Sequence, residues 1–99
     1  MPRHIAHESY EESRSRFVTI VTDNSQYDLV INYTHHFYGK ALILHVQSHR
    51  FGIFDDHDVR DTAVLAAKLG IHNAEDAEIV SDYLEDVMPA FYTPSERYL

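Results

Sequence analysis

The chain has 99 residues, enough for one domain with one modest core. Its 16 acidic and 8 basic side chains give a formal net charge of −8, which argues against a general nucleic-acid binder and against docking on an anionic membrane. The absence of cysteine excludes disulfides, thiolate nucleophiles and cysteine-based zinc sites, and favours the cytoplasm. The N-terminus lacks the apolar run of a signal peptide, and no apolar run approaches the roughly 20 residues that span a bilayer.

The first half of the chain has the composition of strands. Residues 1–15 are charged and without apolar periodicity, so we predict a flexible N-terminal tail. The β-branched run 17–22 predicts a first strand, and residues 23–25 have the short polar side chains of a turn. Residues 27–33 alternate clearly and predict a second strand. Its inner face would carry Tyr27, Leu29, Ile31 and Tyr33.

Two further strands are predicted. Residues 41–48 read as the third strand, with Leu42, Leu44 and Val46 on the inner face. His49 and Arg50 would form a tight two-residue turn into a short fourth strand, residues 51–54. Because the connections are short, neighbouring strands should be antiparallel and the sheet a meander, with the first and fourth strands at its edges.

After Phe54 the apolar period changes from two to 3.6, which predicts a first helix. Asp55 or Asp56 is the expected N-cap, the helix should run to about Leu69, and Gly70 follows its C-cap. The predicted apolar face consists of Val59, Ala63, Ala66 and Ala67 with Leu65 or Leu69.

A second helix should begin after Asn73, its N-cap, and end at Pro89, since proline breaks a helix. Its apolar face would carry Ala77, Val80, Leu84, Val87 and Met88. Strands first and helices last is the α+β pattern. The prediction is one α+β domain over residues 16–89, a four-stranded antiparallel meander followed by two C-terminal helices packed on one face, with residues 90–99 as a C-terminal tail.

The other face of this sheet is predicted to be mixed in character. It would carry Asp28, Val30, Asn32, Thr34, Ala41, Ile43, His45 and Gln47. An antiparallel sheet can show such a face to water, the face can bind a partner or a second copy, or it can bind a small molecule, and these alternatives stay open. The candidate interaction or ligand surface consists of Tyr38, Gly39, Lys40, Asn32, His45, Gln47 and Arg50.

Two short segments are candidates for a ligand or a metal. The loop 35–40 joins two aromatic residues to Gly39 and Lys40, and could contact a small ligand or could close the end of the core. Residues 55–58, Asp-Asp-His-Asp, are the densest set of hard ligands, yet they lack the pattern of a calcium loop and serve equally well as helix caps. We therefore predict no metal site and no cofactor.

The sequence contains no recognisable catalytic motif. No serine lies in a G-x-S-x-G elbow, and three glycines do not make a phosphate-binding loop. The paired carboxylates fall on helix faces where solvent keeps them ordinary acids. We expect no enzymatic activity.

A resemblance adds to this interpretation. The residues that carry it are Arg16-Phe17-Val18, the strand 27–31 followed by Tyr33-Thr34, then Phe37-Tyr38-Gly39-Lys40, and Gln47-Ser48 before Arg50-Phe51. In these the chain resembles, over residues 16–88, a small uncharacterised domain family of Firmicutes. The resemblance implies a bacterial, cytoplasmic, single-domain protein and no residue roles. The histidines of the tail and residues 55–58 are not part of it.

The leading hypothesis for function is a non-catalytic protein-interaction or regulatory domain that self-associates as a homodimer, with a protein partner possible and with neither nucleic acid nor membrane as partner. It rests on the mixed sheet face and on sheet edges that need covering. The alternative is a small ligand- or metal-binding module that uses the loop 35–40 or residues 55–58.

Overall fold

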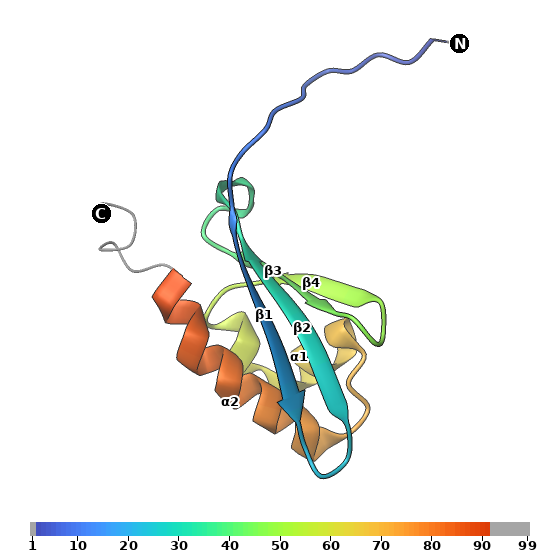
Figure 1. Cartoon of the computed structure of the whole chain (residues 1–99), viewed down its shortest axis with the longest axis vertical. Coiled ribbons are helices and arrows are strands. Elements are labelled where there is room, and N and C mark those ends of the chain that lie inside the picture. Colours follow the sequence, from blue (N-terminus) through green and yellow to red (C-terminus); the bar gives the residue numbers. More distant parts are fainter. Residues whose placement is uncertain (1, 92–99) are drawn as a thin grey trace.

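Four antiparallel strands form one sheet in the computed structural model, which describes residues 2–91 (Figure 1). Their order is β1-β2-β3-β4, so the predicted meander is confirmed, with β1 and β4 at the edges. The bounds are Arg14–Val21 for β1, Gln26–Tyr33 for β2, Ala41–His45 for β3 and Arg50–Phe54 for β4.

Two α-helices follow the strands and pack on one face of the sheet, which confirms the predicted α+β class (Figure 1). They are α1, Thr62–Leu69, and α2, Ala74–Phe91. Short 3₁₀ helices at His35–Phe37 and Asp58–Arg60 lie in the connections. None of the helices in the described part of the chain is long and apolar enough to cross a membrane.

The core lies between this face of the sheet and the helices. Its buried apolar side chains alternate along the strands and recur every three or four residues along the helices, as the burial of one face of each element requires. They are Tyr27, Leu29, Ile31, Ala41, Ile43, Phe54, Val59, Leu65, Leu69, Ile71, Ala77, Val80, Leu84 and Met88.

The predicted orientation of β3 is wrong. Ile43 is fully buried and His45 is 4% exposed, whereas Leu42 and Leu44 are only half-buried and Val46 is exposed. The pairing explains this, because Ile43 lies beside the inward-facing Ile31 of β2 and His45 beside Leu29. A shift of one residue moves every side chain to the other face, and both faces of this strand are apolar enough to be buried. The outer face therefore carries Leu42 and Leu44 in place of Ala41, Ile43 and His45.

The turn between β3 and β4 is also longer than predicted. His45 pairs with Arg50, so residues 46–49 form a four-residue loop. The amide of His49 donates to the carbonyl oxygen of His45, at 3.0 Å, and His49 adopts a positive φ of 62°. Arg50 is therefore the first residue of β4 instead of a turn residue.

The first helix begins later than predicted. Asp55 Oδ1 accepts hydrogen bonds from the amides of His57 and Asp58, at 2.9 and 2.7 Å, which closes a turn ahead of the 3₁₀ helix. Asp61 is the N-cap of α1 and accepts from the amide of Val64 at 3.2 Å. Asp55 thus caps a turn rather than an α-helix, because the chain must first bury Val59 against the core.

The ends of both helices test the remaining predictions. Gly70 ends α1 in the left-handed conformation, and Asn73 Oδ1 accepts from the amide of Asp76 at the start of α2, as predicted. The prediction that Pro89 ends α2 is wrong, since the helix runs to Phe91. Ala63 and Ala67 are exposed, so α1 buries Leu65 and Leu69 with a smaller contribution from Ala66. Of the predicted C-terminal tail, residues 92–99 lie outside the described residues.

The N-terminal segment meets the domain at Glu11. Its carboxylate accepts from Thr34 Oγ1 at 2.6 Å and from the amide of His35 at 3.2 Å, and lies 2.7 Å from His36 Nε2. The hydrogen bond from Thr34, with the lesser effects of the His35 amide and nearby histidines, outweighs burial and lowers the pKa of Glu11. The flexibility of residues 1–15 stays a prediction, but β1 begins within that range, at Arg14.

Candidate functional site

The face of the sheet turned away from the helices, here called the outer sheet face, is largely apolar. Phe17 of β1, Val30 of β2, Leu44 of β3 and Phe51 of β4 pair in register across all four strands. These four residues form what we call the apolar row. Leu42 pairs with Ile53 in the neighbouring row. Phe17 is 77% exposed and Phe51 61% exposed, so aromatic side chains project at both edges of the sheet.

One charged group, Asp28, lies at the end of this face. Its carboxylate accepts from Thr19 Oγ1 at 2.5 Å and from Gln47 Nε2 at 2.7 Å, and its amide donates to Gln47 Oε1. The hydrogen bond from Thr19 is the main reason that the pKa of Asp28 lies below its ordinary value. The charge is thus held at the rim by neighbouring side chains and does not interrupt the apolar row.

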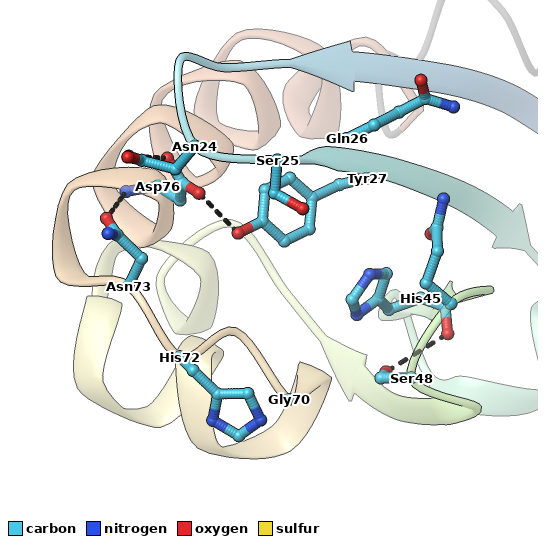
Figure 2. A pocket seen from close by; sticks show the side chains of 11 residues that line it. Asn24, Ser25, Gln26, Tyr27, His45, Ser48, Gly70, His72, Asn73 and Asp76 are labelled. Carbon is cyan, nitrogen blue, oxygen red and sulfur yellow. Dashed lines mark hydrogen bonds between the residues drawn. The ribbon is translucent and has the colours of Figure 1, made fainter.

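A polar pocket of about 540 Å³ lies at one end of the core, where the β1–β2 turn, the β3–β4 turn and the start of α2 meet (Figure 2). We keep the name polar pocket for this cavity. It is lined by Asn24, Ser25, Gln26, Tyr27, His45, Gln47, Ser48, Gly70, His72, Asn73 and Asp76.

Tyr27 and Asp76 form a buried hydrogen bond in one wall of the pocket. Tyr27 Oη donates to Asp76 Oδ2 at 2.6 Å, and Asn24 Nδ2 donates to Asp76 Oδ1 at 3.1 Å (Figure 2). Burial, together with the bond to Asp76 and its charge, raises the pKa of Tyr27 to about 12. Burial also raises the pKa of Asp76, but the hydrogen bonds from Tyr27, Asn24 and Thr22 outweigh it and leave that pKa below its ordinary value. Asp76 is therefore a carboxylate with its charge satisfied inside the fold.

His45 lies beside Tyr27 in the lining of the pocket. Its Nδ1 lies 2.7 Å from the carbonyl oxygen of Leu69, at the end of α1, and Ser48 Oγ donates to the same oxygen at 2.8 Å. The rings of His45 and Tyr27 lie with their centroids 5.2 Å apart. Nε2 of His45 is buried and has no hydrogen-bond partner among the described residues.

The two segments of the alternative hypothesis lie together, although on the far side from the pocket lining. Lys40 Nζ is 3.2 Å from Asp58 Oδ2 and 4.0 Å from Asp55 Oδ2. The amide of Asp55 also donates to Asp58, and this bond is the main cause of the lowered pKa of Asp58. Tyr38 is 97% exposed and has a positive φ of 53°. The carboxylates thus serve turns and an ion pair, and no group of three or more His, Asp or Glu side chains within residues 2–91 is placed to hold a metal ion.

The remaining predicted surface residues do not form one site. Asn32 lies on the outer sheet face and donates to Ser13 and Ser15 of the first strand region. Arg50 reaches toward α1, with Nη1 3.4 Å from the carbonyl oxygen of Ala67. Gly39 has open space around it. The structure brings His45 and Gln47 to the polar pocket but leaves residues 38–40 and Asn32 elsewhere.

Sequence reasoning missed the pairing of Tyr27 with Asp76. In the sequence, Asp76 alone indicates only an acidic residue in the first turn of a helix, where the helix dipole favours an anion, and Tyr27 alone indicates only an inward-facing strand residue. The available signal was Tyr27 itself, since a phenol on an inward face needs a hydrogen-bond partner for its hydroxyl.

Comparison with known proteins identifies a family for this chain. A search of curated proteins finds no match. A family match extends over residues 7–86, which include the four strands, both faces of the sheet and every residue that lines the polar pocket. The chain therefore belongs to the SAV0927-like family, which confirms the resemblance to a small domain family, with no activity in the family's description.

Proposed function

We propose that this protein is a non-catalytic interaction domain that forms a homodimer through its outer sheet face. The observation that supports this is the apolar row, Phe17, Val30, Leu44 and Phe51, which both helices leave uncovered. The bacterial and cytoplasmic setting is part of the proposal and rests on the sequence resemblance and the absence of cysteine.

The exposed apolar area is large for a chain of this size. An aromatic side chain carries roughly 200 Å² of surface, so the exposed fractions of Phe17 and Phe51 leave on the order of 280 Å² from two rings alone. Val30, Leu44, Leu42 and Ile53 extend the patch. Patches of about 300–600 Å² are the largest on ordinary monomers and often mark binding surfaces. A stable interface buries about 800 Å² per partner, more than the apolar patch alone supplies. The polar rim of the face would have to contribute the rest, so we expect a dimer of micromolar affinity.

The distribution of charge favours a second copy as the occupant. Ten of the 16 acidic residues lie between Asp55 and Asp86, in the helical layer and its connections, whereas Asp28 is the one acidic residue that the described strands place on the outer sheet face. Two sheets stacked about 10 Å apart would place the helical layers on the outside, with their axes roughly 30 Å apart. That separation exceeds the Debye length of about 8 Å at physiological salt, so the acidic layers would repel each other weakly.

The apolar row is also compatible with two-fold symmetry. It has a large aromatic residue at each end and smaller residues, Val30 and Leu44, in the middle. A two-fold axis parallel to the strands would place Phe17 over Phe51 of the second copy, and an axis perpendicular to them would place each phenylalanine over its own counterpart. Either arrangement stacks aromatic on aromatic, which is a favourable pairing in an isologous interface.

The test is sedimentation equilibrium of the purified chain between about 1 and 200 µM, a range that brackets a micromolar dissociation constant. The wild type should follow a monomer–dimer equilibrium. The double variant Phe17→Thr and Phe51→Thr, which keeps β-propensity, should be monomeric throughout. Each phenylalanine occurs twice in the dimer, so a loss of about 2 kcal/mol per ring corresponds to at least a thousandfold change in the dissociation constant.

A matched control changes exposed apolar residues of the helical layer. Val64 of α1 is 40% exposed and Ile79 of α2 is 38% exposed. The double variant Val64→Thr and Ile79→Thr should dimerise as the wild type does. A wild-type chain that stays monomeric at the highest concentration would overturn the proposal, and so would a helical-layer variant that dissociates while the Phe17 and Phe51 variant does not.

A further inference from the structure

Polar residues lie on both sides of the apolar row, and their order across the strands restricts how two copies can face each other. On one side, Thr19 of β1 pairs in register with Asp28 of β2, and Val46 donates its amide hydrogen to the carbonyl oxygen of Asp28 at 2.9 Å. We call these three residues the acidic row. They share the outer sheet face with Phe17 and Val30, because alternate residues of a strand point to the same side.

The row on the other side of the apolar row has the same order of polar and apolar residues. It consists of Ser15, Asn32, Leu42 and Ile53, which pair in register across the four strands. We call these four residues the amide row. Its residues on β1 and β2 are polar, and those on β3 and β4 are apolar. The acidic row is likewise polar on β1 and β2, and Val46, which is 44% exposed, follows at the end of β3.

A two-fold axis parallel to the strands matches these rows badly. It places β1 over β4 and β2 over β3 of the second copy, and leaves each row over itself. The polar residues of the amide row would then face its apolar residues, and Asp28 would face Val46, which costs free energy because polar groups lose water without a replacement. With strands about 4.8 Å apart and sheets about 10 Å apart, the two Asp28 carboxylates would also lie about 7 Å from each other, within the Debye length of about 8 Å.

A two-fold axis perpendicular to the strands, through the apolar row, matches the rows well. Each strand lies over its own counterpart, and the acidic row of one copy faces the amide row of the other. The two Asp28 carboxylates are then about 14 Å apart. Sheet twist rotates stacked sheets by about 30°, which shifts these residues by about 3.5 Å, less than the strand spacing, so facing residues stay neighbours. The facing pairs are Thr19 with Ser15, Asp28 with Asn32, and Val46 with Leu42.

The residues around Asn32 can supply hydrogen-bond donors to a carboxylate. Asn32 Nδ2 donates to Ser13 Oγ at 3.0 Å and to Ser15 Oγ at 2.8 Å. A hydroxyl group that accepts a hydrogen bond keeps its own hydrogen to donate. Asp28 accepts from side chains of its own copy, among them Thr19, and a carboxylate has about four acceptor positions, so it has capacity for a donor from the second copy.

We propose that the two-fold axis of the dimer is perpendicular to the strands, and that Asp28 of each copy pairs with the hydroxyl groups around Asn32 of the second copy. This inference rests on the proposed homodimer and adds the residues that set its orientation. The apolar row supplies the buried area, whereas Asp28 and Asn32 select one arrangement, because polar groups at the rim of an interface fix its register.

The first test measures the distance between two spin labels in the dimer. The chain has no cysteine, so Ser25→Cys carries a single nitroxide in the exposed turn between β1 and β2, at the end of the sheet away from the N-terminal segment (Figure 1). Ser25 lies about 17 Å along the strand from the apolar row at Val30, so the perpendicular axis places the labels about 35 Å apart. The parallel axis would place both labels at one end, about 15 Å apart. Dipolar spectroscopy at about 200 µM should give the longer distance.

The outcomes separate this inference from the proposed homodimer. A label distance below about 25 Å would overturn the perpendicular axis and leave the homodimer standing. The absence of any dipolar coupling in the labelled chain would overturn the homodimer, and the arrangement with it. The control is the label in the Phe17→Thr and Phe51→Thr variant, which should show no coupling at the same concentration.

The second test changes a charge at the position that faces Asp28. Asn32→Lys should tighten the dimer at least about threefold in sedimentation equilibrium, because the perpendicular axis brings each ammonium group to Asp28 of the second copy, once in each half of the interface. With the parallel axis the ammonium group would face Leu42, and the dimer would weaken. Ala63→Lys, at an exposed position of α1, is the control for net charge, and the further change Asp28→Asn should cancel the gain. A weaker dimer in Asn32→Lys, or a gain no larger than that of Ala63→Lys, contradicts the proposed pairing.

Discussion

Neighbouring residues of β3 should differ sharply in their effect on stability. Ile43 is fully buried between the sheet and the helices, whereas Leu44 is half-buried on the outer sheet face. Ile43→Ala removes buried carbon atoms and leaves a cavity, which costs about 2–5 kcal/mol. Leu44→Ala in the monomer removes groups that water already reaches, and should cost about 1 kcal/mol.

The measurement is thermal and urea unfolding of the two variants beside the wild type. For a chain of this length 1 kcal/mol corresponds to roughly 4–8 °C, so Ile43→Ala should lower the melting temperature by at least about 10 °C. Leu44→Ala should lower it by less than that at about 1 µM. If Leu44 lies in a dimer interface, its deficit should grow at about 200 µM, because association stabilises the folded state by mass action. The deficit of Ile43→Ala should not change with concentration.

A large effect of Leu44→Ala would contradict this assignment of the two faces of β3. If Leu44→Ala were as destabilising as Ile43→Ala at the lowest concentration, Leu44 would be a core residue. The face of β3 would then be the one expected from the sequence, and the apolar row and the buried position of His45 would both be wrong.

Three further outcomes test other parts of the fold. Leu84→Ala in α2 should cost about 2–5 kcal/mol in urea unfolding, since Leu84 is fully buried, and a loss below about 0.5 kcal/mol would contradict its place in the core. Gly70→Ala should cost about 1–2 kcal/mol, and more than Gly39→Ala, because both have positive φ but only at Gly70 would a Cβ meet atoms within 4 Å. Tyr27→Phe should raise the folded-state pKa of Asp76, whose lowered value stabilises the fold above the unfolded pKa of about 3.9 and is lost as pH falls through the folded pKa. The loss in free energy of unfolding caused by Tyr27→Phe should therefore be largest at neutral pH and should shrink in acid. Urea unfolding at pH values above and below the pKa of Asp76 measures this loss, and a loss independent of pH would contradict the pairing.

Local chemistry was enough to predict the elements and their order. The β-branched runs, the polar turn at residues 23–25 and the change of period after Phe54 each depend on residues close together in the chain. The same is true of the caps at Gly70 and Asn73, where one backbone conformation or one side-chain oxygen decides the helix end. The N-cap of α1 could not be predicted in this way. Asp55 or Asp56 was expected, but Asp61 is the N-cap, because the chain first buries Val59 in a 3₁₀ turn.

The polar pocket could not be predicted in the same way. Its main contact joins Tyr27 to Asp76, 49 positions apart, and the contact of His45 with Leu69 spans 24 positions. Neither pair carries a motif, because each partner alone has an ordinary role in a strand or at a helix end. Only the packing of α2 and the end of α1 against the sheet brings them together.

Both candidate sites depend on one choice, the face that β3 turns inward. With Ile43 and His45 inward, Leu44 completes the apolar row, and the imidazole reaches the carbonyl oxygen of Leu69 at the edge of the polar pocket. A shift by one residue would bury Leu44, bring His45 to the surface, and remove both features together. The sequence alone favours that shifted arrangement, because it buries leucine instead of histidine. The fold thus keeps a histidine in its interior and an apolar row outside it, and the proposed dimer would cover the apolar row.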